Sequence, residues 1–387
     1  MIPAGLHRFP LVEHIVHGES AARVVPGELD RLRKNRAFLV TTASVLRSGL
    51  PAPLIEALGT RLVGTYGAVT AHGPRQCVVD GARAARAAEA NILLTVGGGS
   101  AIDAAKIMQL CLRHGIEHAE QLSAHVARGR SEPSTRPDDA DRWIRAIAVP
   151  TTLSAAEFTW FGGAFNDQRQ VKESFSNPLM MPEVIVMDPA MTLQTPARLL
   201  LSTGMKAIDH AAERLASLQV NPYNDAVSAL ALRFLSDGLR QIQRDPLDMA
   251  ARSAVQYGAF LSMCGGWAGA TVGLGHAIGH ALGGHCGVPH GETSAVMLPS
   301  VMRWNAPANA HRQRLIAEAL GGGKDAGDLL ADLVHALSLP GRLRDVGVDR
   351  TAFASIAAKA AVDPLTRNNP RAVASPADIE EVLKLAW

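Results

Sequence analysis

The chain has 387 residues, of which 47% are hydrophobic and 19% are charged, and its formal net charge is +2. This composition supplies a large core, allows two domains and excludes an intrinsically disordered chain, while the near-neutral charge argues against a nucleic-acid partner. None of the four cysteines forms a C-x-x-C pair, which excludes a zinc knuckle and gives no sign of a disulfide framework. We therefore expect a cytoplasmic protein in a reducing compartment.

Short apolar runs alternate with alanine-rich helical stretches in the first half of the chain. Buried strands are predicted at residues 36–42, 91–96, 145–149 and 184–187. Strands that alternate with helices favour an α/β domain with a parallel, doubly wound sheet. The largely polar stretch 120–142 is predicted to be an exposed loop.

The pattern of predicted secondary structure changes near Thr195. Strand-like runs nearly vanish, and long Ala- and Leu-rich stretches with helical periodicity continue to the C-terminus. We therefore predict an α/β domain over residues 1–192 and an all-α domain over residues 193–387. The uncharged stretch 253–291 is long enough to span a bilayer, but its histidines are costly in lipid, so buried helices around a site are the preferred interpretation.

A glycine run follows the second predicted strand and opens a helix: Gly97, Gly98, Gly99 and Ser100, with Asp103 one turn later. Glycines let the backbone approach a diphosphate, and the free N–H groups at the start of a helix favour its negative charge. The GxGxxG fingerprint is absent, so the run taken alone also fits a tight turn that packs a helix against a strand.

Two adjacent threonines, Thr151 and Thr152, follow another predicted strand. Their hydroxyls are suited to hydrogen-bond a cofactor phosphate or the nicotinamide edge. The alternative is a turn that caps the next helix through a side-chain hydroxyl.

Four histidines fall within fifteen residues of the uncharged stretch: His276, His280, His285 and His290. His276 and His280 are four residues apart and therefore share one helix face. His290 follows a proline, where a new segment can fold back to meet them. Such a concentration of imidazoles in an apolar stretch predicts a site rather than isolated core histidines.

An earlier helix carries Lys206 and His210, again four residues apart. Asp209 is turned about 100° from His210 by helix geometry, so its carboxylate is predicted to face elsewhere. Lys206 and His210 thus join His276, His280 and His290 as candidate catalytic residues.

The succession of GGGSxxDxxK, PTT, D-P-x-x-T and H-x-x-x-H…P-H resembles the group III, iron-containing alcohol dehydrogenases over nearly the whole chain. This resemblance implies the dehydroquinate synthase-like fold, with residues 97–100 on the diphosphate of NAD(P) and with Thr151 and Thr152 in the cofactor cleft. Some relatives end the first strand with an Asp that repels a 2′-phosphate. Thr42 stands there in this chain, which predicts the use of both NADH and NADPH.

The resemblance also bears on metal. In metal-dependent relatives an Asp and three histidines hold the ion, and His210, His276 and His290 match three of those ligands. Lys206 replaces the Asp, and a protonated lysine cannot ligate a metal. We therefore expect a metal-independent enzyme, with any bound metal held by the three histidines.

Further matches, at Ser154-Ala-Ala-Glu157 and Asn369-Pro370-Arg371, resemble the maleylacetate reductase branch. The implied activity is NAD(P)H-dependent reduction of maleylacetate to 3-oxoadipate in aromatic-compound catabolism, by a homodimer. Lys206 would polarise the carbonyl or bind a substrate carboxylate, and His280 would donate the proton. The main alternative is a metal-dependent dehydrogenase of a small alcohol or aldehyde, and a dehydroquinate synthase-type enzyme or a non-catalytic binding protein are further alternatives.

Overall fold

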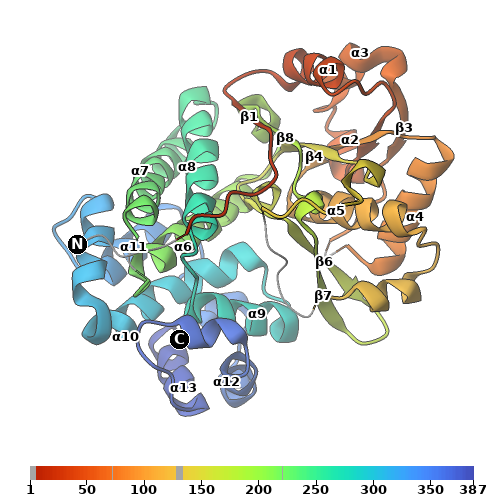
Figure 1. Cartoon of the computed structure of the whole chain (residues 1–387). Coiled ribbons are helices and arrows are strands. Elements are labelled where there is room, and N and C mark those ends of the chain that lie inside the picture. Colours follow the sequence, from red (N-terminus) through yellow and green to blue (C-terminus); the bar gives the residue numbers. More distant parts are fainter. Residues whose placement is uncertain (1–5, 72, 128–133, 220) are drawn as a thin grey trace. The chain divides into compact units, whose positions relative to one another are not determined.

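The structure is a computed structural model that describes residues 6–71, 73–127, 134–219 and 221–387. The chain divides into two compact units (Figure 1). The α/β unit spans Arg8–Thr195, and the helical unit contains Pro196–Trp387 together with the N-terminal end of the described chain. His7 belongs to the helical unit, where its ring lies 5.5 Å from that of Tyr223.

Among the described residues, the α/β unit has one six-stranded parallel sheet in the order β1-β8-β5-β4-β2-β3 and a separate antiparallel hairpin, β6-β7. The strands are β1 His14–His17, β2 Ala37–Val40, β3 Leu62–Tyr66, β4 Ile92–Gly97, β5 Ala146–Pro150, β6 Phe161–Asn166, β7 Val171–Ser176 and β8 Val184–Met187. The helices are α1 Ala21–Arg31, α2 Ala43–Arg47, α3 Ala52–Leu58, α4 Arg75–Ala87 and α5 Gly99–His114. Short 3₁₀ turns are η1 Gly59–Arg61, η2 Ala119–His125, η3 Ala140–Arg142, η4 Ala156–Phe158, η5 Pro178–Met180 and η6 Pro189–Thr192.

Helices cover both faces of the parallel sheet. Successive strand residues point to opposite faces, so Phe38 and Val40 pack in one apolar cluster with residues of α4 and α5. Leu39, between them, packs in a second cluster with residues of α1 and α3. This two-sided burial confirms the predicted doubly wound α/β architecture.

Four of these strands, β2, β4, β5 and β8, lie where the sequence predicts them. The strands β1 and β3 and the hairpin lack a continuous apolar run and were not predicted. In the polar stretch predicted as a loop, the described residues form η2, η3 and irregular backbone, and residues 128–133 lie outside the described part.

The helical unit contains no strand among its described residues. Its helices are α6 Ala197–Ala216, α7 Pro222–Arg244, α8 Met249–Trp267, α9 Leu274–Cys286, α10 His290–Ala319, α11 Ala326–Ala336, α12 Phe353–Ala361 and α13 Pro376–Leu385. Its 3₁₀ turns are η7 Leu343–Val346, η8 Arg350–Ala352 and η9 Pro364–Asn368. An apolar cluster joins α9 to α10, α12 and α13, which fixes the helix that carries the histidines.

The uncharged stretch 253–291 forms most of α8 and all of α9, and much of it is buried. In the described part of the chain, no helix combines the length and the apolar character that crossing a membrane requires. The stretch therefore builds the protein interior, as predicted.

Candidate active site

The glycine run lies at the carboxyl end of β4, and α5 begins at Gly99. A Cβ on Gly98 would come within 2.8 Å of Thr152 Cγ2, and the backbone N–H of Thr151 donates to the Gly97 carbonyl at 3.0 Å. The glycine loop and the threonine pair therefore touch each other at the ends of the neighbouring strands β4 and β5. Carboxyl ends of parallel strands are the usual place for a nucleotide.

Thr42 lies at the end of β2, which pairs with β4. Its hydroxyl accepts from the backbone N–H of Val45 at 3.3 Å and lies 2.9 Å from the hydroxyl of Ser44. Ser100 is in the first turn of α5. The Asp103 carboxylate instead accepts from the backbone N–H of Gly163 in the hairpin, at 3.2 Å, so its described contacts anchor β6-β7 to α5.

Lys106, which completes the glycine motif, is buried. Its ammonium donates to the carbonyls of Ala156 and Phe161 and to the hydroxyl of Thr159, at 2.5, 3.0 and 2.7 Å. Burial lowers the pKa of Lys106 to about 8, and burial raises the pKa of the nearby Glu157 carboxyl to about 7. These contacts tie α5 to the segment after the threonine pair, which gives Lys106 a structural role.

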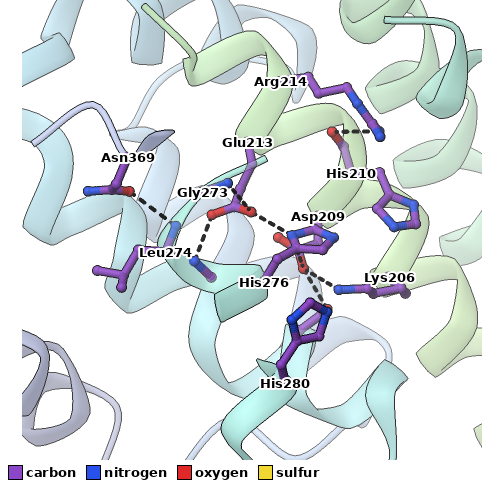
Figure 2. Close-up of polar contacts among 12 residues, drawn as sticks. Lys206, Asp209, His210, Glu213, Arg214, Gly273, Leu274, His276, His280 and Asn369 are labelled. Atoms are coloured by element: carbon purple, nitrogen blue, oxygen red, sulfur yellow. Dashed lines mark hydrogen bonds and ion pairs between the residues drawn. The ribbon is translucent and has the colours of Figure 1, made fainter. Parts of the chain in front are cut away.

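The predicted histidines gather within the helical unit, on α6, α9 and the start of α10. The rings of His210 and His276 stack with centroids 5.0 Å apart, and those of His280 and His290 meet edge to face at 6.4 Å. Figure 2 shows Lys206 extending from α6 toward the same region. Four of the five predicted catalytic residues therefore form two pairs of contacting imidazole rings, and the fifth, Lys206, extends its ammonium group toward the same region.

Asp209 corrects an expectation, because its carboxylate faces the site. The side chain is 1% exposed and accepts from Lys206 Nζ at 3.1 Å and from Ser294 Oγ at 2.6 Å. It also lies 3.5 Å from His276 Nδ1. Burial alone would raise the pKa of Asp209, but the neighbouring His276 imidazole, the Lys206 ammonium and the Ser294 hydrogen bond hold that pKa below its usual range.

The prediction for Asp209 was wrong because it compared Asp209 only with His210. Asp209 is three residues after Lys206, and residues at that spacing are neighbours on a helix surface. Helix α6 also packs against several other helices, so a residue rotated away from one partner still meets another.

Glu213, one further turn along α6, was missed by the sequence analysis. Its buried carboxylate accepts from the backbone N–H groups of Gly273 and Gly275, at 3.1 and 2.7 Å, and from His276 Nδ1 at 2.5 Å (Figure 2). An ionised carboxylate only accepts, so Nδ1 of His276 carries the proton and Nε2 is left as the basic nitrogen. Burial lowers the pKa of His276, which favours this neutral form. The spacing of seven residues from Lys206 was the available signal.

Asp209, Glu213 and His276 form a group that fits a metal ion. One possible ligand atom from each residue lies within 4.8 Å of the others, and all three side chains are buried. Among the described residues, Asp209 Oδ1 and His276 Nε2 are buried without a hydrogen-bond partner. Buried polar atoms are costly when unpaired, and carboxylate oxygen with imidazole nitrogen is a donor set that iron and zinc accept.

Comparison with known proteins gives consistent matches. Residues 13–189 match the family model described as "Iron-containing alcohol dehydrogenase", and residues 200–387 match "Fe-containing alcohol dehydrogenase family, C-terminal". The chain is 31% identical to "Dehydrogenase FUM7" of Gibberella moniliformis over 92% of both proteins, and 29% identical to "Maleylacetate reductase" of Sphingobium indicum over 94% of this chain and 92% of the relative. The crystal structure of maleylacetate reductase from Agrobacterium tumefaciens superposes with a TM-score of 0.83, at 27% identity, over 100% of this chain and 99% of that one.

These findings overturn the expectation that metal is absent. That expectation rested on Lys206 and on the prediction that the Asp209 carboxylate faces away, whereas Asp209 lies beside Lys206 and within the group that can hold a metal. Both family descriptions name iron, and the buried group of Asp209, Glu213 and His276 can hold it. With both halves of the chain matched and the predicted fold present, the chain belongs to the iron-containing alcohol dehydrogenase family.

Proposed function

We propose that the chain is an NAD(P)H-dependent reductase of a small carbonyl compound that carries a carboxylate, with maleylacetate as the first substrate to test. The observation that carries this proposal is the Lys206 ammonium beside the histidines, with its side chain 16% exposed and thus open to a ligand. A cation there suits an acidic substrate better than a neutral alcohol. Maleylacetate reductases among the relatives support the same substrate class.

In the proposed reaction, NAD(P)H and one proton convert maleylacetate to 3-oxoadipate and NAD(P)⁺. The hydride adds to the carbon–carbon double bond conjugated with the ketone, so negative charge develops on the ketone oxygen. Lys206 would stabilise that oxygen or hold a substrate carboxylate, since preorganised charge is usually the largest catalytic contribution. Residues 97–100, Thr151 and Thr152 would bind the cofactor.

The imidazoles and the metal complete the proposal. His280 would donate the proton, and His210 and His290 would provide hydrogen bonds around the substrate. A metal ion held by Asp209 and His276, beside Glu213, would supply Lewis acidity at the carbonyl oxygen when bound.

The second candidate function is oxidation of a small alcohol, or reduction of its aldehyde. The buried metal-capable group of Asp209, Glu213 and His276 favours this activity, because a Lewis acid polarises a simple carbonyl without help from a substrate carboxylate. The two candidates differ in their dependence on Lys206.

The experiment follows NADH absorbance with metal-replete protein, with chelated protein and after iron or zinc is added back, using maleylacetate and a panel of neutral aldehydes. We expect rapid oxidation of NADH when maleylacetate is added, and a slower oxidation after the chelator has removed the metal. Lys206→Met should lower kcat/KM for maleylacetate about 10²-fold or more, as expected for loss of a charged contact to the oxyanion. Lys324→Met, at an exposed lysine paired with Asp332, is the control and should leave the rate unchanged.

Activity with aldehydes alone, unaffected by Lys206→Met, would refute the carboxylate proposal and support the alcohol dehydrogenase.

We also propose a cytoplasmic homodimer that uses NADH and NADPH. Light scattering after size-exclusion chromatography tests the dimer, and parallel assays with both cofactors test their use.

A further inference from the structure

The ring of His280 is held by a carboxylate that comes from a distant part of the sequence. Asp363, 83 residues later, accepts from His280 Nδ1 at 2.8 Å through Oδ2. Asp363 lies between α12 and η9, whereas His280 lies in the middle of α9. The sequence analysis did not identify Asp363, because nothing in its local pattern marks it.

The Asp363 carboxylate is fixed independently of the histidine. Its Oδ1 accepts from the backbone N–H of Leu365 at 2.9 Å and caps η9, and its own backbone N–H donates to the Ala360 carbonyl at 3.1 Å. The Asp363 side chain is 16% exposed, whereas that of His280 is 53% exposed. The Asp363 carboxylate, which the backbone holds in place, therefore binds one nitrogen of the His280 ring, and much of that side chain is exposed to solvent.

This arrangement determines the tautomer of His280. An ionised carboxylate only accepts hydrogen bonds, so the Nδ1 atom of His280 must carry the proton. The Nε2 atom is then the nitrogen that takes up or releases a proton as the ring changes between its neutral and charged forms. A fixed tautomer matters because a general acid must present the correct nitrogen to the reacting atom.

The neighbouring histidines are less suited to this role. His276 is also held through Nδ1, by Glu213, but it is buried and belongs to the metal-capable group. In His285, Nδ1 lies 3.2 Å from Lys359 Nζ and Nε2 lies 3.0 Å from Ser355 Oγ, so both nitrogens are occupied. Of these three rings, His280 alone combines a carboxylate on one nitrogen with an exposed side chain.

We propose that Asp363 is a positioning residue that fixes His280 in the Nδ1-protonated tautomer, so that Nε2 delivers the proton to the substrate. The proposal rests on the reductase activity proposed above. It extends the reaction to a residue that touches neither cofactor nor substrate and that acts through His280.

The test begins with Asp363→Asn, whose amide N–H₂ would face His280 Nδ1 and favour the opposite tautomer. We expect ¹⁵N NMR of the protein to show the His280 proton moving from Nδ1 to Nε2. The value of kcat should fall about 10²-fold or more, as for loss of a correctly placed general acid, with the KM for NADH unchanged. Asp349→Asn is the matched control, because Asp349 caps η8 through Thr351 and contacts no histidine in the described structure.

A double-mutant cycle separates positioning from structural support. In a His280→Ala background, Asp363→Asn should cause no further loss of kcat, because two residues that act as a unit are not additive. Asp363→Ser retains a capping hydroxyl for η9 but is too short to reach the ring, so it tests the same point if the amide variant folds poorly.

An unchanged His280 tautomer in both variants, or an additive loss in the cycle, would overturn the proposal. The NMR measurement requires no substrate. If the wild-type protein reduced neither maleylacetate nor another carbonyl, the proposed function would fail, and the tautomer would still decide whether Asp363 positions His280.

Discussion

Replacing Glu213 by Gln tests the junction between α6 and α9. The carboxylate accepts three hydrogen bonds, from Gly273 N, Gly275 N and His276 Nδ1. The isosteric amide has one acceptor oxygen, which can serve Gly275, and its N–H₂ group then faces the Gly273 N–H and the imidazole. His276 can escape by moving its proton to Nε2, but one buried backbone donor remains unpaired.

Loss of one or two charge-assisted hydrogen bonds, each worth about 1.5–3 kcal/mol, should destabilise the protein by about 2–5 kcal/mol. For a unit of this size, that corresponds to a fall in Tm of about 5–15 °C. Metal affinity should fall about 10- to 100-fold, as is typical when the partner that orients a metal-binding imidazole is removed. Calorimetric unfolding and titration with zinc measure the two effects.

Glu381→Gln is the matched control for this substitution. Glu381 accepts one hydrogen bond, from Trp304 Nε1 at 3.1 Å, and the amide oxygen can retain it. The expected loss is at most about 1 kcal/mol. If Glu213→Gln and Glu381→Gln gave the same small change in Tm, and zinc affinity were unaltered, our assignment of the Glu213 contacts would be refuted.

Two further predictions concern the α/β unit. Burial raises the pKa of the Glu157 carboxyl from an ordinary 4.5 to about 7. The folded wild-type protein therefore loses stability as the pH rises from 4.5 to 7, because the buried carboxyl must ionise. Glu157→Gln lacks this titration, so its free energy of unfolding relative to the wild type should increase by about 1–3 kcal/mol between pH 5 and pH 8. Urea unfolding at both pH values checks this, and an equal difference at the two values would contradict it. Thr42→Asp, at the end of β2, should lower kcat/KM for NADPH about tenfold or more through like-charge repulsion, with little change for NADH. Wild-type rates with the two cofactors that differ by a thousandfold would contradict the shared use of both.

Local sequence patterns predicted the elements whose residues are contiguous. The glycine run after β4, the threonine pair after β5 and the histidine spacing on α9 each express a backbone or helix geometry within a few residues. The doubly wound sheet followed from buried strands of continuous apolar residues, and β1 and β3 were missed because they are only half-buried.

Tertiary contacts determined what the sequence could not show. The direction of the Asp209 carboxylate depends on Ser294 of α10 and His276 of α9, so its angle on α6 alone was misleading. Asp363 reaches His280 only because α12 packs against α9. The metal prediction failed for the same reason, since it dismissed the Asp209 carboxylate from its angle relative to His210, whereas the contact with His276 of α9 brings it into the metal-capable group.

His276 and His280, both on α9, are held by different parts of the chain. His276 depends on Glu213 of α6, whereas His280 depends on Asp363 of the C-terminal segment. In the proposed reaction, substitutions near Asp363 would alter proton delivery by His280 while the metal-capable group keeps its geometry, and changes on α6 would alter metal affinity without moving His280. If both proposals hold, the metal site and the proton donor depend on different segments of the helical unit, so that selection for a new substrate could change one without the other.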